Sequence, residues 1–233
     1  MIKGVAFDFD CTLYERESIW EHLTSGFIDC FGPYITSSLS KEQVKEILRQ
    51  GDTEGVIADD DWQGIFDRYC KYGLFHVPPS FSAFMDFIKT GFPPSIVLHD
   101  DAELCLSELR NMGIKIGMYT NGYSDYSRMK VRATGVDSLI DYFLCSGDIG
   151  IEKPDKRGFS VLAKGMGLKL EEIAFVGDHP SKDVLGAKNA GMTDIWIKAL
   201  VPWPENMECA TYTINNLSEV LDIIKEKNRS VIY

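Results

Sequence analysis

Long apolar runs are missing from this sequence of 233 residues. No stretch approaches the roughly 18 apolar residues that a membrane-spanning helix needs. The chain also enters its first predicted strand without the basic region and apolar segment of a signal peptide. We therefore expect an ordinary soluble protein that has no membrane partner and resides in the cytoplasm. Internal repeats and low-complexity segments are missing too.

Cysteine pairs and an excess of positive charge are missing as well. The six cysteines are widely scattered with no CxxC pair, which favours reduced packing residues over a disulfide framework or a zinc site. Only Cys11 lies beside the chemistry described below, and we interpret it as a small filler in a tight loop rather than a reactive thiol. The net charge of −11 argues against a nucleic-acid partner and would repel an anionic substrate at long range. Such a substrate would need local compensation.

The chain is long and apolar enough to form one substantial hydrophobic core and a smaller second one, since 45% of its 233 residues are hydrophobic and 25% are charged. From about Asp100 the pattern alternates between helix and strand. This alternation predicts an α/β fold, with a parallel sheet and helices on both faces. The predicted strands cover residues 4–7, 114–119, 141–145, 173–176 and 194–197.

The first two predicted strands are separated by a long helical insert. Four helices are expected between residues 15 and 92, and we predict that they form a small separate domain, with residues 1–14 and 93–233 as the core. One of these helices should begin after the capping box of Ser40 and Gln43 and end near Gly51. The acidic run 59–61 is interpreted as a helix start, where negative charge is favourable, and not as a metal cluster.

Two carboxylates follow the first predicted strand directly. Residues 4–7 form a short apolar run typical of a buried central strand, and Asp8 and Asp10 come next. Carboxylates two residues apart repel each other unless positive charge lies between them, and their oxygens suit a hard divalent cation such as Mg²⁺. This stretch therefore indicates a metal-dependent acid site.

Other polar residues follow the later strands. Thr120 and Asp178 each close a predicted strand, and Lys153 lies in the loop after another. Because parallel strands place their carboxyl ends at one edge of the sheet, we expect these residues to converge with the carboxylates of the first strand. Each of these residues alone could have a purely structural role, as a helix cap, a turn former or a surface lysine. The combination is what indicates a site.

With these motifs in order, the sequence resembles the haloacid dehalogenase superfamily, in the phosphatase branch with a helical cap inserted after the first motif. Residues 8–12 match the family's DxDxT motif, and residues 120–122, Thr-Asn-Gly, match its second motif. Residues 153–154, Lys-Pro, match the third motif, and residues 177–183 match the GDxxxxD fourth motif. The resemblance covers the whole chain and implies a Rossmann-like core with an all-helical cap.

The resemblance implies a Mg²⁺ cofactor and a set of ligands for it. The carboxylates of Asp8 and Asp178 and the backbone carbonyl of Asp10 would hold the metal ion. Asp183 would keep these ligands in place from outside the ligand shell. His179 is expected to have a loop or supporting role.

The resemblance also implies how a phosphate ester would be cleaved. Asp8 would attack the phosphorus and form an aspartyl phosphate. Asp10 would protonate the leaving oxygen and then take a proton from the hydrolytic water. The hydroxyl of Thr120, the backbone N–H of Asn121 and the ammonium of Lys153 would bind the phosphoryl oxygens. The partner is then a small phosphorylated metabolite or nucleotide.

Asp10 separates the branches of this family. The dehalogenases lack an aspartate at this position and the phosphonate-cleaving members carry a small residue, so Asp10 favours phosphate-ester hydrolysis. A phosphomutase that uses the same aspartyl phosphate is an alternative, and a binding protein without turnover is a third. Arg16 is a candidate partner for a second anionic group of the substrate. The sequence leaves open the substrate and whether the chain is a monomer or a homodimer.

Overall fold

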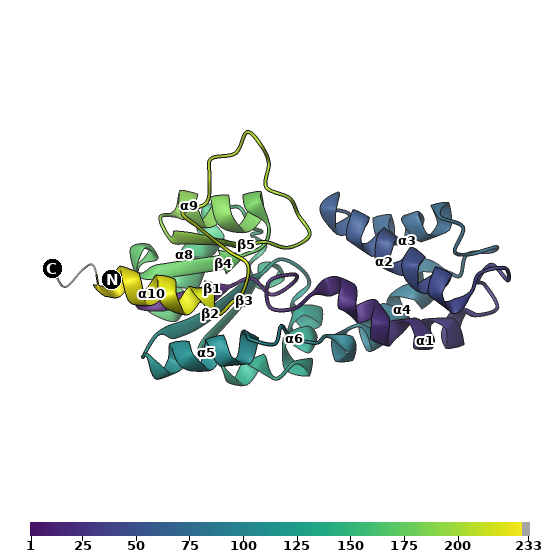
Figure 1. The fold of residues 1–233 in the computed structure, drawn as a ribbon, viewed down its shortest axis with the longest axis horizontal. Helices are drawn as coiled ribbons and strands as arrows, with labels where there is room; N and C mark the ends of the chain where they lie inside the picture. Colours follow the sequence, from purple (N-terminus) through teal and green to yellow (C-terminus); the bar gives the residue numbers. More distant parts are fainter. Residues whose placement is uncertain (230–233) are drawn as a thin grey trace. The chain divides into compact units, whose positions relative to one another are not determined.

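The computed structural model describes residues 1–229, and the chain divides into two compact units. One unit comprises Met1–Tyr14 and the chain from Leu98 onward, and the other comprises Glu15–Val97. We call them the α/β unit and the helical unit (Figure 1). The helical unit is inserted into the α/β unit directly after the first strand and the turn that follows it.

The α/β unit is built on a sheet of six parallel strands in the order β3-β2-β1-β4-β5-β6. The predicted α/β fold is thereby confirmed. The sixth strand was not predicted, because it has only three residues, too few to show a periodic pattern. The strands are β1 (Gly4–Phe7), β2 (Lys115–Thr120), β3 (Tyr142–Cys145), β4 (Ile173–Gly177), β5 (Thr193–Ile197) and β6 (Tyr212–Ile214).

Helices cover both faces of this sheet. Figure 1 shows α8 and α9 on one side and α5 on the other. On the side of α8, the rings of Phe159, Tyr119 and Phe175 are fully buried in one apolar cluster, which fixes the helix against the strands. The helices of this unit are α5 (Ala102–Asn111), α6 (Ser124–Ala133), α7 (Ser146–Ile149), α8 (Lys156–Met166), α9 (Gly186–Ala190) and α10 (Glu219–Arg229).

The helical unit contains four α-helices, as the pattern predicted. The capping box forms, since the Ser40 hydroxyl accepts from the Gln43 N–H and the Gln43 side chain accepts from the Ser40 N–H. Asp61 caps the next helix, which confirms the helix-start interpretation of the acidic run. The four helices are α1 (Ile19–Phe31), α2 (Lys41–Ile57), α3 (Trp62–Lys71) and α4 (Phe81–Gly91).

Two predicted boundaries in the helical unit were wrong. Helix α2 continues through Gly51, because this glycine serves close packing: a Cβ atom there would lie 2.7 Å from the Tyr69 ring. The helical unit ends after Val97 and not after residue 92. The reason is that Phe92 is fully buried and that the turn Pro93–Ser95 packs against α1 and α4.

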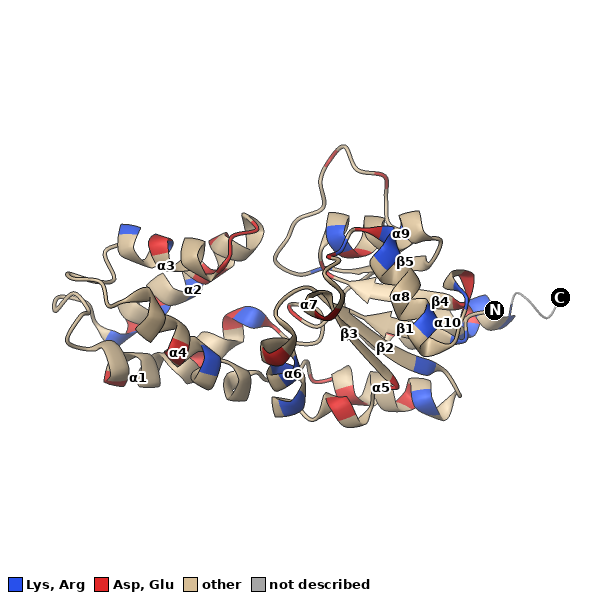
Figure 2. Cartoon of the chain, turned by 180° about the vertical axis from the view of Figure 1, so that it is seen from behind, with Lys and Arg blue, Asp and Glu red and all other residues tan. Residues whose placement is uncertain are grey.

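The distribution of charged residues, the apolar character of the helices and the state of the cysteines agree with what the composition indicated. Figure 2 shows acidic and basic residues on the helices of each unit, so the net charge of −11 is spread along the chain. Within residues 1–229, no helix combines the length and the apolar character needed to cross a membrane. All six cysteines are free thiols, as their spacing indicated.

Candidate active site

The first strand delivers Asp8 to the carboxyl edge of the sheet. Its backbone N–H still donates to the Val176 carbonyl of β4 at 2.9 Å, so Asp8 is held as if the strand continued. The chain then turns tightly, with the Thr12 and Leu13 N–H groups both donating to the Phe9 carbonyl. Cys11 lies in this turn with a left-handed φ of 59° and is buried, in agreement with a filler role. The turn brings Thr12 back onto the end of the strand.

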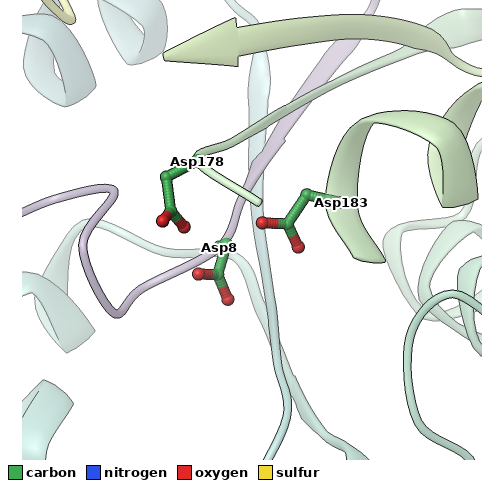
Figure 3. Close-up of side chains that lie close together, drawn as sticks. All are labelled: Asp8, Asp178 and Asp183. Atoms are coloured by element: carbon green, nitrogen blue, oxygen red, sulfur yellow. The ribbon is translucent and has the colours of Figure 1, made fainter. Parts of the chain in front are cut away.

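Three carboxylates from two strand ends lie close together at this edge (Figure 3). Asp8, Asp178 and Asp183 are all buried, and each contributes an oxygen to a set of atoms that lie within 4.8 Å of one another. Asp8 and Asp178 are separated by 170 positions in the sequence, as their numbers give. Such a group of buried carboxylate oxygens is suited to a hard divalent cation.

The turn after β4 fixes Asp178 and Asp183 relative to each other. The Asp183 carboxylate accepts from the His179 N–H at 2.9 Å, and a Cβ atom on Gly177 would lie 2.4 Å from the Asp183 side chain. Only glycine therefore permits this approach. The segment Pro180–Leu185 forms a wide π-helical turn, and α9 starts only after it. In this turn the His179 carbonyl accepts from the N–H groups of both Asp183 and Val184.

The electrostatics of the cluster favour a bound cation. Burial, and next to it the negative charges of Asp183 and Asp10, raise the pKa of Asp8 to about 7 against the opposing effect of Lys153. Burial, together with Asp183 and Asp8, also raises the pKa of Asp178 well above its usual value. These shifts mean that one lysine does not neutralise three buried carboxylates. A divalent cation bound by them would supply the missing positive charge, so the donor set fits the metal ion that the sequence predicts.

Lys153 is the cation that does reach the cluster. Its side chain is 3% exposed, and its Nζ lies 2.6 Å from Asp8 Oδ1 and 2.7 Å from Asp183 Oδ1. Burial alone would lower the pKa of Lys153, but the carboxylates of Asp183 and Asp8 outweigh burial and raise it. Lys153 therefore stays protonated and places a positive charge beside Asp8, where the sequence predicted one.

The second motif holds the loop that carries Lys153. The Asn121 side chain accepts from the Lys153 N–H at 2.8 Å and donates to the Lys153 carbonyl at 3.1 Å. This two-point attachment joins the end of β2 to the loop between α7 and α8. Thr120 is buried at the end of β2, where its hydroxyl donates to the Asn121 carbonyl at 3.4 Å. The sequence analysis assigned phosphoryl binding to the backbone N–H of Asn121. It did not predict that the Asn121 side chain would hold the Lys153 loop.

Thr12 and Trp196 support the cluster, and sequence reasoning assigned a role to neither. The Thr12 hydroxyl accepts from the Asp178 N–H at 3.1 Å and lies 3.3 Å from Asp178 Oδ1 and 3.5 Å from Asp8 Oδ2. The Trp196 indole N–H donates to the Asp178 carbonyl at 2.8 Å. Thr12 is the last residue of the DxDxT motif, so the sequence contains a signal that could have predicted its role. For Trp196, on β5, only the tertiary structure shows the contact.

Asp10 directs its side chain to other partners. Its carboxylate does not belong to the three-carboxylate cluster found within residues 1–229. Instead it forms an ion pair with Lys130 of α6, whose Nζ lies 2.6 Å from Oδ1 and 2.5 Å from Oδ2. The Tyr14 hydroxyl also donates to Oδ1. The Asp10 carboxylate is therefore engaged by a lysine and a tyrosine. Lys130 was not predicted, since a single lysine in an amphipathic helix carries no distinguishing signal.

Arg16 has a partner within the helical unit. Its guanidinium forms two hydrogen bonds of 2.9 Å with the carboxylate of Asp52, which is 1% exposed. It also lies 5.0 Å from the centre of the Trp62 ring and 5.1 Å from that of Phe92. This geometry favours a structural role for Arg16 over the binding of a second anionic group of the substrate.

Comparisons with known proteins agree with the motifs. A family model described as haloacid dehalogenase-like hydrolase matches residues 2–191. The chain is 30% identical over 231 residues to a glyceraldehyde 3-phosphate phosphatase of Methanocaldococcus jannaschii, covering 97% of this chain and 98% of that protein. It is also 40% identical over 100 residues to a phosphoserine phosphatase of Thermus thermophilus, covering 43% of this chain and 40% of that protein.

A solved structure shows the same likeness over the full length. The crystal structure of a haloacid dehalogenase-type phosphatase from Thermococcus onnurineus matches with a TM-score of 0.67 and 27% identity, covering 96% of this chain and 98% of that one. Because the family model spans most of the chain and full-length relatives share its fold, this protein belongs to the haloacid dehalogenase-like hydrolase family.

Proposed function

We propose that this hydrolase is a magnesium-dependent phosphatase that cleaves a small-molecule phosphate monoester through an aspartyl phosphate on Asp8. The chain is a phosphoric monoester hydrolase, as its family and its phosphatase relatives indicate. The observation that carries the mechanism is the buried cluster of Asp8, Asp178 and Asp183 with Lys153 inserted into it. The cluster holds a nucleophile, a cation site and a fixed positive charge at one strand edge.

Magnesium is proposed because all the donors are oxygen atoms and the cluster is short of positive charge. Asp8, Asp178 and the Asp10 carbonyl would hold the ion, with Asp183 supporting them. When bound, the ion supplies positive charge that offsets the negative charge of a phosphoryl group. The raised pKa values of Asp8 and Asp178 support this proposal, since a nearby cation would offset the burial and the negative charges that disfavour ionisation of both carboxylates.

Asp8 would be the nucleophile. A carboxylate oxygen of Asp8 forms a bond to phosphorus while the bond from phosphorus to the leaving oxygen breaks. Lys153, fixed 2.6 Å from Asp8, would neutralise a phosphoryl oxygen. The Thr120 hydroxyl and the Asn121 N–H, at the end of the neighbouring strand, would hold the other oxygens.

Asp10 would move the protons in both half-reactions. It gives a proton to the leaving alcohol oxygen, and it later accepts one from the water that attacks the aspartyl phosphate. Phosphate then leaves and the Asp8 carboxylate is restored. Within residues 1–229 the side chain of Asp10 lies outside the three-carboxylate cluster and pairs with Lys130, which supports a separate role as general acid and base.

We propose that the helical unit is the cap of this enzyme and that it limits the substrate to small molecules. Its four-helix composition and its insertion directly after the first motif support this assignment. A cap that closes over a site excludes water and bulky substrates. Two relatives are named for glyceraldehyde 3-phosphate and phosphoserine, so these compounds come first in a substrate panel.

The test is phosphate release from a panel of phosphorylated metabolites, with Mg²⁺ and with a chelator. We expect release that needs Mg²⁺ and falls to background in the Asp8→Asn variant at saturating metal. The variant keeps the size of the side chain but lacks a carboxylate nucleophile. The control is Asp222→Asn, which removes an exposed carboxylate on α10. Release by metal-saturated Asp8→Asn protein at the wild-type rate would contradict the proposal.

The same assay separates hydrolysis from the phosphomutase alternative. A mutase would interconvert sugar phosphates, would need priming by a bisphosphate and would release little free phosphate. The phosphatase relative that is similar over 97% of this chain favours hydrolysis. A complete lack of turnover across a broad panel with Mg²⁺ would favour the third alternative, a binding protein.

A further inference from the structure

Lys130 forms a partly buried ion pair with Asp10 within the α/β unit. It lies on α6, a helix with three basic residues, Arg128, Lys130 and Arg132, that carries blue segments in Figure 2. Its Nζ is within 2.6 Å of both carboxylate oxygens of Asp10, and its side chain is only 7% exposed. Asp10 is more accessible, with 24% of its side chain exposed. The side chain of Asp10 is therefore partly exposed, while that of Lys130 is almost fully buried.

The surroundings of Lys130 hold its ammonium in place. The ammonium lies 5.8 Å from the centre of the Phe9 ring and 5.4 Å from that of Tyr126, within the range of cation–π attraction. The Tyr14 hydroxyl donates to the same oxygen, Oδ1, that Lys130 contacts. An ion pair at the surface contributes little, but a partly buried pair with an additional donor restricts the orientation of its groups. Lys130 and Tyr14 together hold the Asp10 carboxylate in one orientation.

We propose that Lys130 is a positioning residue for Asp10, holding its carboxylate where a proton can be given to and taken from the reacting oxygens. This inference rests on the proposed function, in which Asp10 is the general acid and base. The proton passes from Asp10 to the leaving oxygen as the bond to phosphorus breaks, and later from water to Asp10. Lys130 keeps its own protons in both steps and does not touch the substrate.

The dependence of the rate on the leaving group tests this role. p-Nitrophenolate leaves readily as an anion, whereas phenolate benefits more from a proton delivered by Asp10. A displaced general acid should therefore slow phenyl phosphate more than p-nitrophenyl phosphate. A merely structural defect would slow both esters equally.

The variants are Lys130→Met, which keeps an unbranched apolar side chain without the charge, and Lys130→Arg, which keeps the charge. With Lys130→Met we expect kcat to fall about a hundredfold for phenyl phosphate and less than about tenfold for p-nitrophenyl phosphate, with KM for both nearly unchanged. Lys130→Arg should restore part of the loss. Arg132→Met, which removes an exposed charge from the same helix, is the matched control and should leave both rates unchanged.

A double-mutant cycle with Asp10→Asn completes the experiment. If Lys130 acts through Asp10, adding Lys130→Met to Asp10→Asn should lower kcat little further. Equal losses for the two esters, or losses that multiply in the double variant, would overturn the proposal. If Lys130→Met does not fold, Lys130→Gln takes its place, and equal losses for the two esters in that variant overturn the proposal as well.

The failure of this inference is distinguishable from a failure of the proposed function. Wild-type protein that hydrolyses both esters with Mg²⁺, together with inactive Asp8→Asn protein, supports the function whatever the Lys130 variants do. Wild-type protein that releases phosphate neither from the two aryl esters nor from any member of the metabolite panel overturns the function and the role of Lys130 with it.

Discussion

At the scale of single residues, Thr12 links two strand ends through one hydroxyl group. The hydroxyl accepts from the Asp178 N–H and lies within 3.5 Å of carboxylate oxygens of both Asp178 and Asp8. Thr12 is fully buried, so no water replaces these contacts when the hydroxyl is removed. A buried donor left without its acceptor costs free energy. The contribution of Thr12 is therefore to hold two of the proposed metal ligands at a fixed separation.

Replacing Thr12 by valine should weaken both folding and metal binding. The change keeps the shape but leaves the Asp178 N–H unsatisfied, and we expect a loss of about 1–3 kcal/mol in the free energy of unfolding. Mg²⁺ affinity should fall about 10- to 100-fold. Denaturant unfolding and isothermal titration measure the two effects. Thr12→Ser should restore both, and Thr213→Val, at an exposed position of β6, is the control. Wild-type Mg²⁺ affinity in Thr12→Val protein would show that the hydroxyl does not position the ligands.

At the scale of structural elements, the end of β2 determines where the Lys153 loop lies. Asn121 binds both the N–H and the carbonyl of Lys153 through its side chain. The Tyr119 hydroxyl adds a hydrogen bond of 2.9 Å to the Ile151 carbonyl in the same loop. A loop with no regular structure of its own is thus attached to a buried strand. This attachment places the Lys153 ammonium within 2.7 Å of two carboxylates.

Replacing Asn121 by alanine should release this loop while it leaves the backbone N–H of residue 121 in place. We expect kcat to fall about a hundredfold, because a displacement of about 1 Å at a charged group has an effect of this size. Steady-state kinetics with the best substrate of the panel measure the change. Asn206→Ala, in the exposed stretch before β6, provides the control. A kcat close to wild type would mean that the loop keeps its position without Asn121.

At the scale of the whole molecule, the site reduces the stability of the metal-free protein near neutral pH. Burial raises the pKa of Asp8 in the folded state from its usual 3.8 to about 7, so the folded state binds this proton more tightly than the unfolded state does. Stability from this group is present below pH 3.8 and is lost as the pH rises through about 7. The raised pKa of Asp178 acts in the same direction. A bound divalent cation would reverse this loss by favouring the ionised carboxylates.

We therefore predict opposite pH effects with and without metal. In chelator, the melting temperature of wild type relative to Asp8→Asn should fall as the pH rises from about 4 to about 7, because only the wild type must ionise a buried carboxyl group there. At a fixed Mg²⁺ concentration equal to a hundred times the Kd measured at neutral pH, the wild type should gain about 2.7 kcal/mol at neutral pH. The gain should be smaller at lower pH, because protonated carboxylates bind the ion less tightly. Thermal unfolding across this pH range measures both. A relative stability that rises with pH in chelator would contradict the assignment of Asp8.

The sequence was sufficient to predict the elements whose signals are local. The strands preceding Asp8, Thr120 and Asp178 are short apolar runs that end abruptly in polar residues. The helix caps at Ser40 and Asp61 follow from side-chain chemistry within three residues. The convergence of Asp8 and Asp178 also followed, because parallel strands share one carboxyl edge whatever separates them in the chain.

The tertiary structure decided the contacts that depend on which surfaces meet. Lys130 reaches Asp10 from 120 positions away, and Trp196 reaches the Asp178 carbonyl from a neighbouring strand. Gly51 has the appearance of a helix end in the sequence, yet it lies within α2 because the Tyr69 ring needs the space. The physical reason is the same in each case. Local patterns specify the backbone conformation of a segment, whereas side-chain pairing is set by the packing of segments that the sequence does not place side by side.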